Sequence, residues 1–258
     1  MRIAEHLDAL RREGELMAVA ADRAGLAAAV PSCPAWQVKD LLRHTGYIHR
    51  WAARHITERP AEVIDGPSEA QILRGGAADE DLLGWFRAGH AALVETLAGA
   101  DPEVRCATFM PAPSPLAFWT RRQAHETAIH RADAELAAGA APEYPAGFAA
   151  DGIDELITGF GQRRKYQPQA GSAADGGRLR VVAADTGDAW SIEIRQGRLQ
   201  PRRETGAGAA ADAGCTVSGP ASGLYLYLWN RADAATVAVT GDPELLARWR
   251  EGVRVRWG

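Results

Sequence analysis

Four long segments in the first half of the sequence are expected to be helices, and three of them carry apolar residues at every third or fourth position, the period of an amphipathic helix. A helix with one apolar stripe has to bury it against another element, so this pattern constrains the chain to pack helix on helix. The stripe of the first segment is formed by Ile3, Leu7, Leu10, Gly14, Met17 and Ala21. The four segments together predict an antiparallel bundle with at least one long connection.

The second helix is expected to begin near Pro34, because Ser32 suits an N-cap and proline suits a first helical turn. Its inner face is expected to hold Leu41, His44, Ile48 and Trp51. The third helix should span about 79–98, with Leu82, Phe86, Leu93 and Leu97 inward. The proline-rich stretch 111–115 opposes helix, and the fourth helix should follow over about 117–138.

The second half of the chain has a different pattern. Residues 139–147 are rich in Ala, Pro and Gly and indicate a boundary between a helical domain (1–145) and a second domain (146–258). After one further helix, about 148–164, short strands are expected at 179–182, 190–194, 215–218 and 236–239. Helices should open at Gly219-Pro220, ending near Arg231, and at Asp242-Pro243. Residues 204–214 are expected to form a loop. The fold class predicted is α+β.

Composition excludes several classes of protein. Apolar residues make up 47% of the 258 residues, enough for a core, and the net charge of −4 gives no electrostatic reason to expect nucleic acid or a membrane as partner. No run approaches the roughly 20 apolar residues of a spanning helix, and the start lacks the layout of a secretory signal. The three separated cysteines, Cys33, Cys106 and Cys215, favour a reducing cytoplasm over a disulfide framework. A cytoplasmic monomer or homodimer is expected.

The fourth helix contains His125, Glu126 and His130, and their spacing decides which of them can share a ligand. His125 and His130 are five residues apart, about 140° around a helix, so they point to different sides. Glu126 and His130 are four apart, about 40° around and roughly 6 Å along, so they share a face. The pair that can reach one metal ion is therefore Glu126 with His130.

His44 is the best candidate for a third ligand, because its neighbours Leu41, Ile48 and Trp51 place it inside the bundle. Two histidines and one carboxylate are typical of catalytic zinc with an open position, and also of non-haem iron. The ordinary alternatives are a hydrogen-bonded core histidine and a solvated Glu–His pair. The remaining histidines, His49, His55, His90 and His125, are assigned to the surface or to contacts behind the ligands.

Three stretches of the sequence resemble the mycothiol-dependent maleylpyruvate isomerase family. The first is Val30-Pro31-Ser32-Cys33-Pro34-Ala35-Trp36 and its continuation to His44, and the second runs from Arg122 to Glu135 through His125-Glu126-Thr127-Ala128-Ile129-His130. The third comprises Val217-Ser218-Gly219-Pro220 and Leu224 to Arg231. The resemblance covers almost the whole chain in the same order.

The resemblance implies a DinB-like four-helix bundle followed by a small α+β domain of sterol-carrier type. It also implies a divalent metal, most often zinc, held by His44, Glu126 and His130, and mycothiol, the small thiol of actinobacteria, as cosubstrate. Arg231 is implied to bind substrate or assist catalysis, although Asn230 stands where a small residue, often Gly, is expected before it.

The family includes isomerases and enzymes that transfer mycothiol to an electrophile, and both chemistries need a thiolate that a metal can stabilise. Arg43, Arg50, Arg121 and Arg122 are candidates for carboxylate contacts, with surface charge as the simpler interpretation. Cys33, at the expected helix start, is a less favoured nucleophile. The competing hypotheses are a non-enzymatic, metal-stabilised ligand-binding protein and an iron oxygenase.

Overall fold

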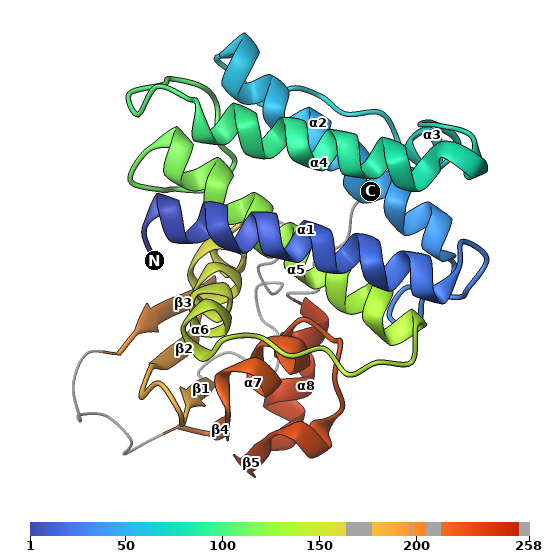
Figure 1. The fold of residues 1–258 in the computed structure, drawn as a ribbon. Coiled ribbons are helices and arrows are strands. Elements are labelled where there is room, and N and C mark those ends of the chain that lie inside the picture. Colours follow the sequence, from blue (N-terminus) through green and yellow to red (C-terminus); the bar gives the residue numbers. More distant parts are fainter. Residues whose placement is uncertain (164–176, 197, 205–212, 253–258) are drawn as a thin grey trace. The chain divides into compact units, whose positions relative to one another are not determined.

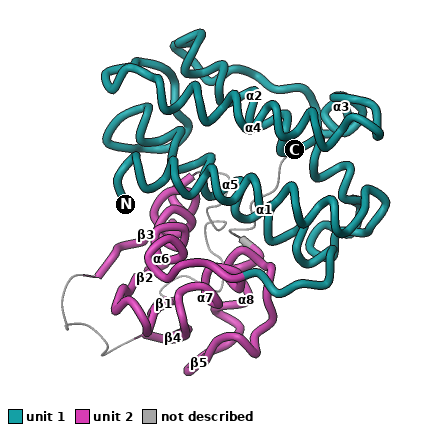
Figure 2. The backbone as a smooth tube through the Cα atoms, in the orientation of Figure 1, with its two compact units in different colours: residues 1–142, 257–258 teal, residues 143–256 magenta. Residues whose placement is uncertain are grey.

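The computed structural model describes residues 1–163, 177–196, 198–204 and 213–252. Most of the expected loop at 204–214 and the last residue of the expected helix 148–164 lie outside these residues. The chain divides into two compact units, Met1–Pro142 and Glu143–Arg256, which Figure 2 distinguishes by colour.

The first unit is a four-helix bundle. Its long helices are α1 (Ile3–Ala24), α2 (Val38–Glu58), α4 (Leu82–Ala98) and α5 (Pro115–Ala137). α1 packs against α5 and α4, and α2 packs against the same two helices. The order around the bundle is therefore α1, α5, α2, α4 (Figure 1). A short helix, α3 (Glu69–Arg74), and a 3₁₀ turn, η1 (Asp79–Asp81), lie in the long α2–α4 connection. The predicted bundle and its long connection are confirmed.

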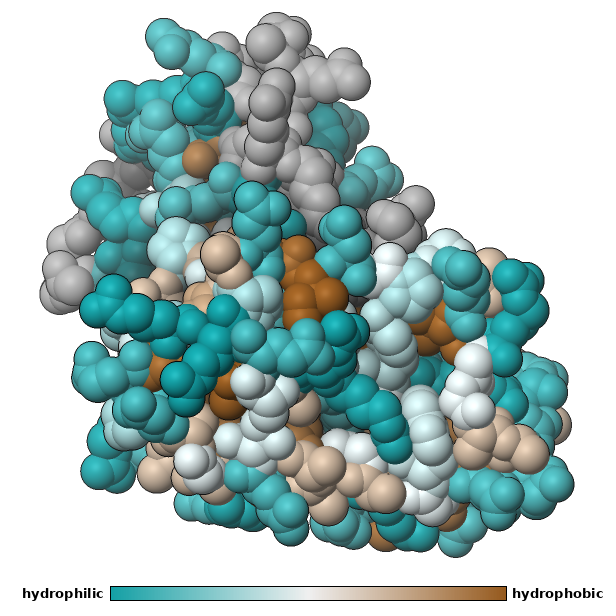
Figure 3. Space-filling view, turned by 90° about the horizontal axis from the view of Figure 1, so that it is seen from above, coloured by the Kyte–Doolittle hydropathy of each residue, from teal (hydrophilic) through white to brown (hydrophobic). Residues whose placement is uncertain are grey.

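The predicted apolar stripes form the core of this bundle. Leu10 and Met17 of α1, Leu41 of α2 and Phe86 of α4 are fully buried. Only Met1, Leu16 and Val19 are large hydrophobic residues with exposed side chains among those the structure describes. In the view of Figure 3, hydrophilic residues cover most of the surface and hydrophobic ones show as small separate spots.

Two predicted helix starts are wrong. α2 begins at Val38 rather than near Pro34, because Gln37 is its N-cap and the carboxylate of Asp40 accepts the Gln37 backbone N–H at 2.9 Å. Cys33 therefore does not lie at a helix start, and the argument for a thiol activated there fails. α5 begins inside the proline-rich stretch: Pro115 occupies the first turn, where no N–H is needed, and Ser114 caps the helix.

The second unit is built on a mixed five-stranded sheet of order β3-β2-β1-β4-β5. Its strands are β1 (Arg178–Ala183), β2 (Ala189–Arg195), β3 (Arg198–Arg203), β4 (Cys215–Gly219) and β5 (Ala238–Gly241). β1 pairs parallel with β4, and the other pairings are antiparallel. The α+β prediction is confirmed, but the sequence does not predict β3, because its arginines and Pro201 are uncommon in strands. A proline is tolerated there because β3 is an edge strand.

The helices of the second unit are α6 (Ala146–Asp154), α7 (Ala221–Leu228) and α8 (Pro243–Gly252). α6 continues as a π-helical turn, η2 (Glu155–Gly159), and a 3₁₀ turn, η3 (Phe160–Gln162), while η5 (Ala234–Thr236) precedes β5. No helix among the described residues is both long and apolar enough to cross a membrane.

Gly14 on α1 yields a stability prediction. A methyl group at this position would overlap the imidazole of His90 on α4, whose Nε2 bonds the Leu10 carbonyl at 2.9 Å. We expect Gly14→Ala to destabilise the protein by about 2 kcal/mol, although alanine normally favours helix. The measurement is the free energy of unfolding in urea.

The matched control is Gly84→Ala in α4, where a methyl group meets nothing within 4 Å. It should stabilise the protein by roughly 0.5–1 kcal/mol. Equal effects of the two substitutions would show that the α1–α4 contact at His90 does not require glycine.

Candidate metal centre

The predicted ligand residues lie together inside the first unit. His44 comes from α2, and Glu126 and His130 come from α5, one helical turn apart. All three side chains are buried, and one ligand atom of each lies within 4.8 Å of the other two. The helical spacing of Glu126 and His130 therefore does place both side chains on one face, toward His44.

The distances within this cluster suit a small divalent cation. Glu126 Oε1 lies 3.5 Å from His44 Nε2 and 3.3 Å from His130 Nε2. Ligand atoms about 2.0–2.1 Å from a tetrahedral zinc are themselves about 3.4 Å apart. In addition, Glu126 Oε1 is buried and makes no hydrogen bond, which is costly for a carboxylate oxygen. The cluster thus fits the group that the family resemblance implies.

The other oxygen of Glu126 is held by Arg122, one turn earlier on α5. Arg122 Nη2 donates to Glu126 Oε2 at 3.0 Å, and both side chains are buried. Burial alone would raise the pKa of the Glu126 carboxyl, but His130, His44 and the charge of Arg122 outweigh it and hold that pKa well below its usual value. Glu126 is therefore an anion at every pH of interest.

His130 is oriented by a buried carboxylate. Its Nδ1–H donates to Asp133 Oδ2 at 2.8 Å, and Asp133 Oδ1 accepts a hydrogen bond from the Ser32 hydroxyl. This pattern leaves His130 Nε2 toward Glu126 and His44, as in metal sites where a carboxylate fixes the tautomer of a histidine ligand. Ser32, expected to cap a helix, instead ties the α1–α2 loop to this network.

The two histidines of the cluster have opposite proton affinities. Burial lowers the pKa of His44 and outweighs its contact with Glu126, so its ring is neutral at pH 7. Burial also disfavours the charged His130, but the hydrogen bond to Asp133 and the nearby Glu126 carboxylate outweigh it and raise the pKa of His130 to about 9. The ring of His130 is therefore protonated in the metal-free protein at neutral pH.

Trp36 covers one side of the two imidazoles. Its ring centroid lies 5.0 Å from that of His44 and 6.3 Å from that of His130, and its Nε1–H donates to Glu69 Oε1 at 3.2 Å. Trp36 itself is only partly buried. An aromatic face against both ligands excludes water from that side.

The remaining histidines of this unit are buried, so the surface part of their assignment is wrong. His49 Nε2 bonds the Thr127 hydroxyl at 2.9 Å. His55 bonds the Trp51 carbonyl through Nδ1, and the Ile64 N–H donates to its Nε2. His125 lies beside His6, with ring centroids 6.0 Å apart, and so points away from the ligand cluster as the helical spacing predicts.

The arginines proposed as carboxylate contacts have different roles in the structure. Arg43 pairs with Asp79, and Arg50 stacks on Trp85 with its guanidinium carbon 3.8 Å from the ring centroid. Arg122 is buried against Glu126, so a surface position for it is wrong. The guanidinium groups of these three arginines thus contact other side chains of the protein. Arg121 on α5 is partly buried.

Arg231 belongs to the second unit, directly after α7. Asn230 before it has φ of 62°, the left-handed conformation that glycine adopts most easily and asparagine tolerates. The N–H of Asn230 bonds the Tyr227 carbonyl and that of Arg231 bonds the Leu226 carbonyl, the Schellman pattern of a helix end. Asn230 therefore adopts the left-handed backbone conformation for which a glycine would be expected at this position.

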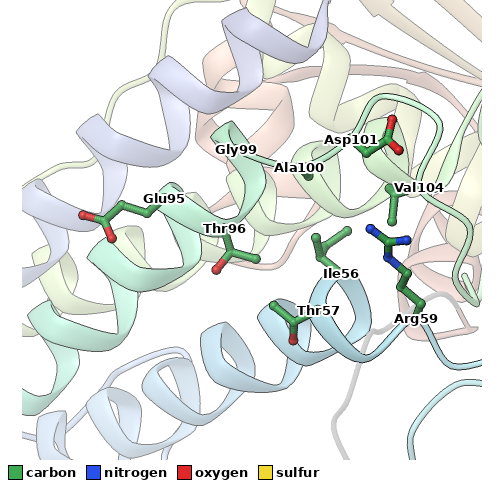
Figure 4. A pocket seen from close by; sticks show the side chains of 9 residues that line it. All are labelled: Ile56, Thr57, Arg59, Glu95, Thr96, Gly99, Ala100, Asp101 and Val104. Atoms are coloured by element: carbon green, nitrogen blue, oxygen red, sulfur yellow. The ribbon is translucent and has the colours of Figure 1, made fainter.

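A separate hollow of about 360 Å³ lies in the first unit near the carboxyl ends of α2 and α4 (Figure 4). It is lined by Ile56, Thr57, Arg59, Glu95, Thr96, Gly99, Ala100, Asp101 and Val104. Ile56 is twelve residues from His44 along α2, roughly 18 Å. This hollow is therefore distinct from the ligand cluster.

Comparisons with known proteins agree with this architecture. Two solved structures, of the mycothiol-dependent maleylpyruvate isomerase and of an alanine mutant of it, each match with a TM-score of 0.64 and 13% identity over 93% of both chains. At this identity the likeness shows the fold. A comparison with curated proteins finds no match.

Family models match both parts of the sequence. The model described as the mycothiol maleylpyruvate isomerase N-terminal domain matches residues 7–135. The model described as the MDMPI C-terminal domain matches residues 147–248. Because the two matches follow one another in order and together cover most of both units, the chain belongs to the mycothiol maleylpyruvate isomerase family.

Proposed function

We propose that this chain is a metal-dependent isomerase that uses mycothiol as thiol cosubstrate and acts on a small, electrophilic cis-unsaturated acid of the maleylpyruvate type. The observation that carries the proposal is the convergence of His44, Glu126 and His130 within a buried site, in a chain of this family. The three cysteines, all free thiols, favour the cytoplasm as its location.

The three ligand residues would hold a divalent metal, and we propose zinc, for which two imidazoles and one carboxylate form a typical catalytic site. When bound, the metal supplies a Lewis acid that keeps the sulfur of a thiol in its thiolate form. His44 is ready to coordinate because its ring is neutral, whereas His130 has to release a proton from Nε2. Arg122 and Asp133 keep the ligand atoms oriented, and Trp36 shields them from water.

The chemistry of isomerisation then follows from the thiolate. The sulfur adds to the conjugated cis double bond, which becomes a single bond, and the pair of electrons moves onto the carbonyl oxygen. Rotation about that single bond and departure of the sulfur, as the electron pair returns from the oxygen, restore the double bond in the trans form, so the thiolate is regenerated. We assign Arg231 to the substrate carboxylate or the developing enolate charge, since a guanidinium binds such groups with two hydrogen bonds.

The first prediction tests the metal and the activity together. His44→Ala should lose the bound metal and reduce isomerisation of maleylpyruvate by at least about 1000-fold, because the metal that His44 helps to hold would generate the thiolate. Metal content is measured by mass spectrometry, and the reaction is followed by absorbance with mycothiol present.

The matched control is His55→Gln. His55 is a buried histidine of the same helix, about 16 Å along it from His44, and in the contacts named above its ring bonds backbone groups only. It should lose stability and keep its metal. A His44→Ala protein with unchanged metal content overturns the ligand assignment, and accumulation of a stable mycothiol conjugate would instead indicate a transferase.

The second prediction concerns protons released on metal binding. With the pKa of His130 raised to about 9, metal-free protein carries this proton at pH 7, and coordination through Nε2 has to displace it. Zinc affinity should rise about tenfold per pH unit up to pH 9 and then level off. Calorimetric titrations in buffers of different ionisation enthalpy measure the proton count, and Asp133→Asn, which removes the carboxylate behind His130, should reduce it.

The third prediction concerns Arg231. Arg231→Gln should lower kcat/KM for maleylpyruvate by about 100-fold, since one charge-assisted contact to the transition state is lost, and should leave metal content unchanged. Asn230→Gly, which preserves the left-handed backbone, should keep full activity. Equal kcat/KM in Arg231→Gln and the unaltered protein excludes this arginine from the reaction.

A further inference from the structure

Arg122 occupies an unusual place for a cation. Its side chain is 1% exposed, lies on the same helix as Glu126 and Asp133, and directs Nη2 to Glu126 Oε2 at 3.0 Å. A buried guanidinium is costly to desolvate, so a pair of this kind is weak evidence for stability alone. The position of Arg122 next to one ligand residue suggests a role in the site.

The two oxygens of Glu126 have different surroundings. Oε2 accepts the hydrogen bond from Arg122, whereas Oε1 faces the Nε2 atoms of His44 and His130 and has no hydrogen bond. A carboxylate that binds a metal through both oxygens directs a lone pair of each at the ion. The hydrogen bond from Arg122 engages Oε2 and opposes that arrangement, which favours coordination of Glu126 by Oε1 alone.

We propose that Arg122 is a positioning residue that holds Glu126 to coordination by one oxygen and thereby keeps a coordination position open for the thiol. The inference rests on the proposed metal site. It extends to charge: two neutral imidazoles and the Glu126 carboxylate leave a divalent ion with one positive charge, and Arg122 offsets the negative charge that Asp133 adds behind His130, so the site stays positive by one. In a buried site, this excess favours an incoming anion such as a thiolate.

Cobalt substitution tests the inference, because the visible bands of Co²⁺ report its coordination number and a bound thiolate adds a charge-transfer band in the near ultraviolet. The full chain is loaded with Co²⁺ and titrated with 2-mercaptoethanol. The unaltered protein should give intense four-coordinate bands on adding the thiol. Arg122→Gln should give weaker bands of higher coordination and bind the thiol at least about tenfold less tightly.

Two further variants separate this role from stability. Arg122→Lys keeps the charge, so its thiol affinity should stay within about threefold of the original. Arg131→Gln removes another buried arginine of α5, which pairs with Glu13 and Glu135 instead of a ligand residue. It should lower the unfolding temperature and leave the cobalt spectrum unchanged.

The outcomes are distinct. Cobalt bands and thiol affinity that stay the same in Arg122→Gln, in protein that circular dichroism shows to be folded, overturn the inference alone. Should Arg122→Gln fail to fold, a loss of thiol affinity of about tenfold or more in folded Arg122→Lys overturns the charge argument. Failure of the unaltered protein to bind cobalt overturns the proposed metal site and the inference with it.

Discussion

The contact between α2 and α5 places ionisable groups where water cannot solvate them, and much of the first unit compensates for this. A buried carboxylate or imidazolium is tolerated only with partners. Arg122 supplies one to Glu126, and Asp133 supplies one to His130. Ser32 in turn secures Asp133. After these pairings Glu126 Oε1 still makes no hydrogen bond, and it lies between two imidazole nitrogens. A bundle folded for stability alone has no reason to keep such an arrangement.

The burial of α5 is the feature of the bundle that the sequence predicts least well. Its buried residues lie all around the helix and include Thr120, Arg122, Gln123, His130 and Arg131. Polar residues are mostly exposed in proteins, so the burial of polar side chains on every side of α5 does not follow from its sequence. The apolar stripes of α1, α2 and α4 could be predicted because their burial is one-sided. The burial of Arg122 on α5 and of His49 on α2 could not, because it depends on how these helices pack against each other and against α4.

Local spacing predicted more of the site than of the helix ends. Glu126 and His130 share a face because four residues nearly complete a turn, and that geometry does not depend on the neighbours. The start of α2 does depend on them. Ser32 could cap a helix at Pro34 equally well from sequence alone, yet its hydroxyl bonds Asp133, about 100 residues later. The same limit explains why β3 was missed: its pairing with β2 outweighs the weak strand preference of its residues.

Generating a thiolate and selecting the electrophile that it attacks are separate tasks, which different residues of the chain would perform. His44, Glu126 and His130 would generate a thiolate whatever molecule it attacks, so the same cluster serves an isomerase or a transferase. What distinguishes the two reactions is the fate of the adduct, which reverts when an adjacent carbonyl can accept electrons and stays when it cannot. Selection of the electrophile must therefore rest on residues beyond the ligands, and Arg231 is the first of these to consider. Its backbone position is fixed by the end of α7, where Asn230 supplies the left-handed turn. A change of substrate within this architecture thus needs no change in the metal ligands.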